Sequence, residues 1–139
     1  MLSGDDQDNR LAGRAGDDML EGFDGFDRLF GGEGNDMLDD GLGNDRINGG
    51  LGDDILTGGE GSDRFIFRLD SGDDQITDFV AGLGIGDEIN LRAFNFTDFA
   101  DVQSVMIDTD GGALLALTGG SVLFQGVAVS QFAADDFLV

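Results

Sequence analysis

The chain has 139 residues and a formal net charge of -22, from 29 acidic and 7 basic residues. It contains no Cys, His, Lys, Tyr or Trp, which excludes disulfides, thiolate or imidazole metal sites, Ser–His–Asp triads, P-loops and Schiff-base chemistry. The charge disfavours nucleic acids and anionic membranes as partners, because both are bound through basic patches. No apolar run reaches the ~20 residues that span a bilayer, and we expect no cleaved N-terminal signal peptide.

Residues 4–66 divide into seven consecutive nonapeptides without an insertion. The fourth residue is Gly in six repeats, the sixth is Asp in six, and the eighth is large and apolar in all seven. The sixth-position aspartates are Asp18, Asp27, Asp36, Asp45, Asp54 and Asp63. The first repeat departs from the pattern, with Gln7 at its fourth position and Asn9 at its sixth, and Arg14, Phe23 and Asp40 each replace one glycine of a double-glycine start.

Each nonapeptide is predicted to form a glycine turn followed by a short strand whose eighth side chain enters a core. The seventh position shows how many repeats make one coil, because an arginine recurs there every 18 residues, at Arg10, Arg28, Arg46 and Arg64. Met19, Met37 and Ile55 recur with the same period, out of phase. We therefore predict an all-β fold, a right-handed parallel β-roll with 18 residues per coil, with the arginines on one sheet and the apolar stripe on the other.

The repeats require a cation, because stacking brings carboxylates together and one buried apolar residue is too little to order nine residues. The available ligands are Asp carboxylates and turn carbonyls, and flexible oxygen sites favour Ca²⁺ over Mg²⁺. Each ion would bridge two sixth-position aspartates of successive coils. Four sites are expected, at Asp18–Asp36, Asp36–Asp54, Asp27–Asp45 and Asp45–Asp63, while a fifth between Asn9 and Asp27 and a sixth between Asp54 and Asp74 are left open. The alternative, a flexible acidic tail, would give the eighth-position apolar residues no role.

The composition changes at about residue 67, where glycine thins and the first of eight more Phe appears. Alternation predicts strands over 64–69, 75–80, 88–91, 104–107, 114–117 and 121–124, with hairpin turns at Asp110-Gly111 and Gly119-Gly120. Two short helices are expected, with N-caps at Thr97 and Ser130. A roll leaves an open apolar end, so we expect residues 67–139 to form an antiparallel, β-rich cap on the roll of residues 4–66.

The pattern GGxGxDxUx, with U a large apolar residue, fits residues 13–66 and resembles the RTX (repeats-in-toxin, haemolysin-type) calcium-binding proteins. The segment from Asp74 through Asp87 to Leu91, with an expanded loop at 81–86, is similar to the region after the roll in serralysin-type proteases and alginate epimerase modules. The last residues, 135–139, are similar to an uncleaved C-terminal signal for type I secretion. The resemblance implies that the sixth-position aspartates, Asp74 and turn carbonyls bind calcium. The carbonyls would lie around Gly32, Gly34, Gly41, Gly43, Gly50, Gly52, Gly59 and Gly61.

The leading hypothesis is therefore a calcium-folded, secreted and extracellular bacterial module. Its partners would be the type I secretion machinery and a catalytic or toxin domain upstream of this chain. A second hypothesis is binding of an anionic polysaccharide such as alginate through Arg10, Arg28, Arg46 and Arg64, although a simpler interpretation pairs these arginines with nearby Asp, Glu33 or Glu60. An enzyme is disfavoured, because the aspartates are needed for the metal and no Tyr or Trp provides a sugar platform.

Overall fold

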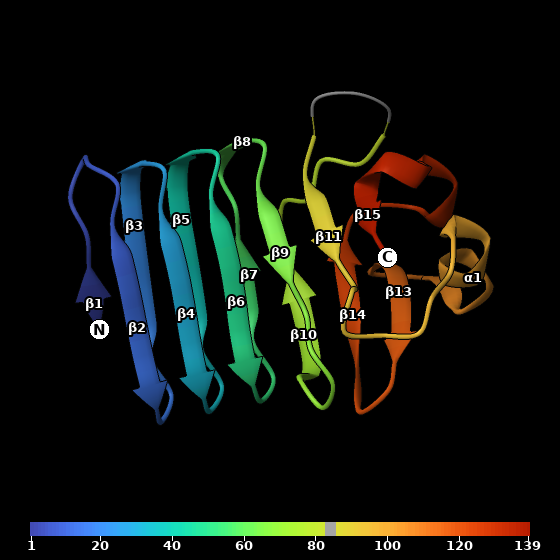
Figure 1. Ribbon diagram of the computed structural model, residues 1–139, viewed down its shortest axis with the longest axis horizontal. Coiled ribbons are helices and arrows are strands. Elements are labelled where there is room, and N and C mark those ends of the chain that lie inside the picture. The colour runs from blue at the N-terminus through green and yellow to red at the C-terminus, as the bar shows by residue number, and fades with distance from the viewer. Residues whose placement is uncertain (83–85) are drawn as a thin grey trace.

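The computed structural model describes residues 1–82 and 86–139, so the centre of the loop expected at 81–86 lies outside the described residues. The chain winds into a flattened roll in which two sheets face each other and tight turns connect them at both edges (Figure 1). Successive coils stack from the N-terminal end toward the C-terminal end of the molecule. The prediction of a parallel roll with 18 residues per coil is confirmed.

The two sheets alternate along the chain. The first sheet has the strand order β1-β3-β5-β7-β10-β14-β13-β12, with β8 paired to β5. Its strands are β1 (Leu2–Ser3), β3 (Met19–Gly25), β5 (Met37–Gly43), β7 (Ile55–Thr57), β8 (Glu60–Gly61), β10 (Gly72–Ile76), β12 (Met106–Thr109), β13 (Gly112–Leu117) and β14 (Gly120–Gln125). The second sheet has the order β15-β11-β9-β6-β4-β2. Its strands are β2 (Arg10–Ala15), β4 (Arg28–Glu33), β6 (Arg46–Leu51), β9 (Arg64–Ile66), β11 (Glu88–Asn90) and β15 (Phe137–Leu138).

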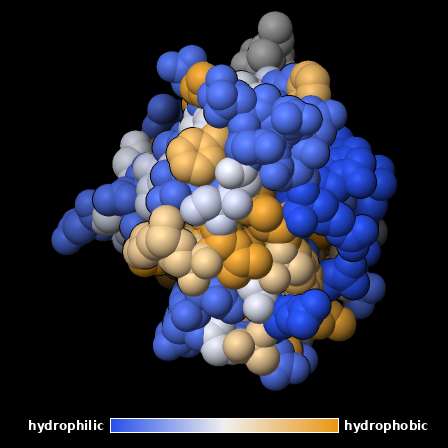
Figure 2. Space-filling model, turned by 90° about the vertical axis from the view of Figure 1, so that its left-hand side faces the viewer, coloured by the Kyte–Doolittle hydropathy of each residue, from blue (hydrophilic) through white to orange (hydrophobic). Residues whose placement is uncertain are grey.

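The eighth-position side chains fill the space between the sheets, as predicted. From Leu20 to Phe65 each is at most 2% exposed, whereas Leu11 in the first coil is only half-buried. Figure 2 views the molecule from this N-terminal end and shows apolar side chains in the middle, surrounded by polar ones. The seventh-position residues point outward, because side chains alternate along a strand. Met19 pairs with Met37 and Met37 with Ile55 on the first sheet, and all three are exposed.

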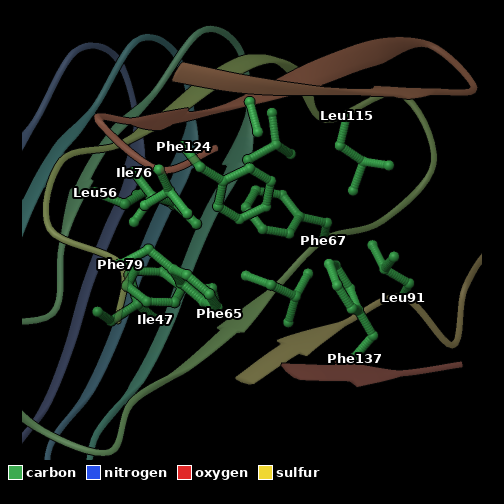
Figure 3. Close-up of a cluster of buried hydrophobic side chains, with 14 of the residues drawn as sticks. Ile47, Leu56, Phe65, Phe67, Ile76, Phe79, Leu91, Leu115, Phe124 and Phe137 are labelled. Carbon is green, nitrogen blue, oxygen red and sulfur yellow. The ribbon is translucent and has the colours of Figure 1, made fainter. Parts of the chain in front are cut away.

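Parallel stacking continues beyond residue 66. Strand β10 pairs in parallel with β7 and β14, and β11 pairs in parallel with β9 and β15. An antiparallel hairpin series, β12–β13–β14, then closes the C-terminal end. Aromatic rings fill the junction (Figure 3), where Phe124 contacts Phe132 at a centroid distance of 4.8 Å and Phe79 at 5.2 Å. Among the described residues no helix is long and apolar enough to cross a membrane.

The two expected helix starts are wrong. Helix α1 (Phe99–Ser104) begins one residue later than predicted, because Asp98 rather than Thr97 is the N-cap and accepts a hydrogen bond from the Asp101 amide at 3.1 Å. Ser130 does not cap a helix either, since it lies inside a short 3₁₀ turn, Val129–Gln131. A second 3₁₀ turn spans Ala134–Asp136. Two strands are also shifted: the one expected at 75–80 is β10, which starts earlier, and the one expected at 104–107 is β12, which starts after α1 ends.

Candidate metal centre

Glycine turns bring the backbones of successive coils into close approach. All eight glycines whose carbonyls are expected to bind calcium have positive φ, between 84° and 156°, a conformation that residues with a Cβ rarely adopt. The space is equally restrictive, because a Cβ on Gly34 would lie 2.6 Å from the carbonyl oxygen of Gly16 in the preceding coil. Each turn therefore presents carbonyl oxygens to the next coil. Gly32, Gly34, Gly50 and Gly52 lie at or just beyond the ends of β4 and β6, at one edge of the roll. Gly41, Gly43, Gly59 and Gly61 lie at the other edge, at the end of β5 and in or next to β8.

The sixth-position carboxylates form one row along each edge. The first row is Asp18, Asp36, Asp54 and Asp74, and the second is Asp27, Asp45, Asp63 and Asp87, with Asn9 at its start. In every step Oδ1 of the aspartate accepts a hydrogen bond from the backbone amide of the sixth-position residue one coil earlier, at 2.6–3.0 Å. The structure thus brings together each pair of residues that the sequence paired.

The second oxygen of these carboxylates is different. Oδ2 is buried and has no hydrogen-bond partner among the described residues in Asp27, Asp36, Asp45, Asp54 and Asp63, each of which is at most 2% exposed. It faces the start of its own repeat, because a Cβ at Gly22 or Gly58 would lie 2.5–2.6 Å from Oδ2 of the aspartate five residues later. A buried carboxylate oxygen without a donor is costly unless a proton or a cation neutralises it.

Burial also makes these groups poor anions in the absence of a cation. It raises the pKa of Asp54 to about 6 and that of Asp63 to about 7, against the amide hydrogen bonds that lower both. The pKa values of Asp36 and Asp45 are raised for the same reason. A hard divalent cation next to Oδ2 would supply the missing partner and favour the ionised form. The orphaned oxygens therefore fit Ca²⁺, with the aspartates as carboxylate ligands.

The rows end differently at the C-terminal side. The side chain of Ser71 hydrogen-bonds Asp74, whose pKa burial raises to about 7. Asp87, which the sequence analysis did not include among the site residues, continues the second row, and its Oδ2 accepts a hydrogen bond from the Val80 amide at 2.8 Å. It lies 24 residues after Asp63 instead of 18, so a search at the repeat spacing misses it. Protein donors thus satisfy the last carboxylate of each row.

A third set of ladder contacts was also missed. Fifth-position side chains accept hydrogen bonds from the backbone amide one coil later, the opposite direction to the sixth position, as in Asn35 to Asp17 at 2.9 Å and Asp53 to Asn35 at 3.1 Å. Short polar residues recur at this position in all repeats except the one with Phe26, which is the signal that would have revealed it. Among the described residues no three His, Cys, Asp or Glu side chains form a group that could hold a metal.

The four arginines lie in register on the outer face of the second sheet, as predicted. Arg10, Arg28 and Arg46 line a groove of about 300 Å³ together with Phe30 and Arg68. For the simpler interpretation, in which nearby Asp and Glu33 or Glu60 balance these arginines, the structure shows one ion pair among residues 1–82 and 86–139, and it joins Arg64 to Glu88. The register explains this, since parallel pairing of identical repeats stacks arginine on arginine and leaves the acids at the turns.

Comparisons with known proteins agree with this architecture. Residues 3–38 and 31–65 match the family model described as the RTX calcium-binding nonapeptide repeat in four copies. A search of curated protein sequences found no match. Among solved structures, the chain is similar to the extracellular lipase LipA from Serratia marcescens, with 24% identity and a TM-score of 0.58 over 98% of this chain.

The chain spans only 20% of the lipase. It is also similar to two subunits of the Azotobacter vinelandii mannuronan C5-epimerase, AlgE6R3 and AlgE6R2, with 28% and 29% identity and TM-scores of 0.41 and 0.48. It covers 80% and 91% of those subunits and is itself covered to 97% and 99%. The lipase likeness shows the fold, and the family match identifies the repeats. Residues 3–65 of this chain therefore carry RTX calcium-binding nonapeptide repeats.

Proposed function

We propose that this chain is a calcium-folded module that supports the type I secretion and extracellular folding of a bacterial protein. The observation that carries the proposal is the row of buried Oδ2 atoms without a donor along each edge of the roll. Without a cation the roll must bury these charges unpaired or protonate them. Where calcium is scarce the chain would stay unfolded, and where calcium is abundant ion binding would drive the coils together.

We further propose that Asp18, Asp27, Asp36, Asp45, Asp54 and Asp63 are the carboxylate ligands and that the turn glycines provide the carbonyl ligands. Four ions between these aspartates are the expected minimum. Asn9 offers a neutral amide oxygen in place of a carboxylate, and its side-chain Nδ2 donates a hydrogen bond to the Gln7 carbonyl oxygen, which is then less available as a ligand. Both features disfavour the site between Asn9 and Asp27. The hydrogen bond from Ser71 to Asp74 disfavours the site between Asp54 and Asp74 in the same way.

The C-terminal residues support a link between export and folding. Residues 135–139 form part of the folded core, because Phe137 is 6% exposed and β15 adds to the edge of β11. Asp136 is buried, and its carboxylate accepts hydrogen bonds from the amides of Gly82 and Ala133. A secretion signal in this tail would therefore be accessible only before the chain folds. Export of an unfolded chain followed by calcium-driven folding would meet that requirement, and a catalytic or toxin domain upstream would be exported with it.

The folding part is tested by far-ultraviolet circular dichroism during a calcium titration of EDTA-treated protein. We expect a cooperative change from coil to β structure near millimolar calcium, and none with magnesium. A double variant, D36N/D45N, would lose one bridging carboxylate from each row and should require more calcium, while D108N, in the exposed β12–β13 hairpin, serves as the control. A β spectrum that EDTA does not change would contradict the proposal.

The secretion part needs a separate experiment. Deletion of residues 135–139 should abolish export by a type I system, while substitution of the exposed Val139 by Ala should leave it intact. Because the tail also contributes to the core, export is scored in calcium-free medium, where folding does not contribute. Undiminished export of the deletion variant would exclude a signal at 135–139 and leave the calcium-folding proposal untouched.

The arginine groove supports a second candidate function, binding of an anionic polysaccharide such as alginate. Arg10, Arg28 and Arg46, which form no ion pair within the described part of the chain, provide cations in register at the spacing of adjacent strands, ~4.8 Å. They lie next to the exposed ring of Phe30. A second groove of about 360 Å³, lined by Arg14, Phe30, Leu51 and Arg68, adjoins it. R28Q/R46Q should abolish retention on alginate without changing calcium-induced folding, whereas R92Q, an exposed arginine outside the grooves, should not. Equal retention of both variants would exclude this function.

A further inference from the structure

Asp40 departs from the repeat at a position that is otherwise glycine. It is the first residue of the fifth nonapeptide, where the other six repeats have Gly4, Gly13, Gly22, Gly31, Gly49 and Gly58. Those glycines face the space between coils, where the sixth-position Oδ2 atoms point. A Cβ on Gly22, for example, would lie 2.6 Å from Oδ2 of Asp27 and 2.5 Å from the carbonyl oxygen of Asp40 in the next coil. A side chain at this position therefore extends into the interior of the second row.

The Asp40 side chain lies in that interior without a hydrogen-bond donor or a cationic side chain from the described residues. It is 0% exposed, and neither of its carboxylate oxygens has a hydrogen-bond partner. No ion pair involves it among the described residues, where the single pair is Arg64–Glu88. A fully buried carboxylate with two orphaned oxygens costs several kcal/mol unless it is neutralised. Nothing in the fold requires it, since glycine serves the same position in every other repeat.

The Asp40 carboxylate faces the carboxylates of two coils. Its Oδ1 and the Oδ2 of Asp27 both lie 2.6 Å from the position that a Gly22 Cβ would take. Burial, together with the neighbouring charges of Asp45, Asp27 and Asp63, raises the pKa of Asp40 to about 9. The other row offers a direct comparison, because Gly49 takes the place of Asp40 beside Asp36 and Asp54. Of the four expected sites, the one between Asp27 and Asp45 is thus the one with a third carboxylate next to it, that of Asp40 at the first position of the repeat that contains Asp45.

We infer that Asp40 is an additional carboxylate ligand of the calcium ion between Asp27 and Asp45, and that it makes this the tightest site of the roll. The inference rests on the proposed function, because it assumes that the sixth-position aspartates bind calcium. Affinity in oxygen sites rises with the number of charged ligands, and a third carboxylate would leave the site with a net negative charge. Among the described residues these three carboxylates do not already form a metal-binding group, so we expect calcium binding to bring the Asp40 carboxylate closer to those of Asp27 and Asp45. The Asp27–Asp45 coils would then bind first and order their neighbours.

Isothermal titration calorimetry of the full chain with calcium chloride, after EDTA treatment, tests this inference. We expect one ion in a class tighter than the rest for the unmodified chain. D40N keeps the size of the side chain but removes its charge, and it should weaken that tightest class about tenfold or more. D40G, which restores the glycine of the repeat, should do the same. D39N removes an equal charge from the adjacent exposed residue and should change the affinity less than about twofold, because surface charges are screened.

Two results would overturn the assignment. Unchanged affinity of the tightest class in D40N would show that Asp40 does not touch the ion. An extra calcium ion bound by D40G, or tighter binding by either variant, would show that the Asp40 side chain fills the site and excludes calcium from it. Both results leave calcium-driven folding of the chain in place. Absence of any calcium response in the unmodified chain would instead overturn the proposed function, and this inference with it.

Discussion

The roll and the C-terminal end of the molecule hold themselves together by different means. From Leu20 to Phe65 the roll buries one large apolar side chain per nonapeptide. Among the described residues of the whole roll, five sixth-position carboxylate oxygens and both oxygens of Asp40 are buried without a hydrogen-bond partner. The C-terminal end packs Phe79, Phe124 and Phe132 against one another, and no buried carboxylate oxygen beyond Asp63 lacks a partner among the described residues. We therefore expect the stability of the roll to depend on bound cations, whereas that of the C-terminal end depends on apolar packing between its own side chains.

Removal of calcium should separate the two regions most clearly. If each ion is present at a hundred times its dissociation constant, it contributes about 2.7 kcal/mol, so loss of four exceeds the stability of many whole domains. Hydrogen–deuterium exchange in EDTA should therefore show loss of protection throughout β2 to β7. The β12–β14 hairpins should retain more protection, since they depend on apolar packing. Uniform exchange over both regions would show that they fold as one calcium-dependent unit.

Of the single substitutions considered, removal of a ring from the aromatic cluster should lower the free energy of unfolding most in the presence of calcium. Phe124 is 0% exposed and touches two rings, so F124A should lower the free energy of unfolding by about 3–5 kcal/mol. Leu123 lies on the opposite face of the same strand and is half-buried, which makes L123A the matched control, with an expected loss of about 1 kcal/mol. Urea unfolding in saturating calcium measures both. Equal losses would mean that the ring cluster does not hold this end together.

The sequence predicts the roll better than its C-terminal end because repetition multiplies a weak signal. One nonapeptide would not distinguish strand faces, but seven in phase placed Leu20 to Phe65 inside and Met19, Met37 and Ile55 outside, as the structure has them. The residues that were missed lie where the spacing breaks. Asp87 follows Asp63 after 24 residues, and the start of α1 depends on a choice between two adjacent capping residues, Thr97 and Asp98, that composition does not decide.

Asp40 shows a second limit of the sequence. It is visible as a departure from the double-glycine start, but a local turn change and a buried ligand look the same in one dimension. Only the stacking of Asp27, Asp40 and Asp45 across coils reveals that the side chain is interior and unpaired. Register rather than composition likewise explains why Arg10, Arg28 and Arg46 form no ion pair among the described residues.

Acidity should sharpen the comparison by affecting the roll in the absence of calcium. Burial raises the pKa of Asp54 to about 6 and those of Asp63 and Asp74 to about 7, from 3.8. The folded roll then binds more protons than the unfolded chain, so the contribution of these groups is complete below about pH 4 and is lost as the pH rises through about 6–7. In EDTA, β structure should be greater at about pH 4.5 than at about pH 8. In saturating calcium the order should reverse, because protons compete with the ion. Circular dichroism at both pH values checks this, and a roll in EDTA that is more stable at the higher pH would contradict the assigned burial.

The smallest expected effect concerns the turns themselves. Phe23 occupies a second-position turn site with φ 80°, where Gly41 and Gly59 stand in the next two coils. A residue with a Cβ destabilises the folded state by about 1–2 kcal/mol in this conformation. Glycine avoids that strain but loses more backbone entropy on folding, which offsets part of the gain. Phe23 is 47% exposed, so its ring contributes little burial. F23G should therefore raise the free energy of unfolding in saturating calcium by about 0.5–1 kcal/mol. The reverse change, G41A, should lower it, since a Cβ there would also collide with the Phe23 carbonyl oxygen. Destabilisation by F23G would mean that the Phe23 ring packs against the roll. The roll would then be stabilised at this position by apolar side-chain packing, as the C-terminal end is.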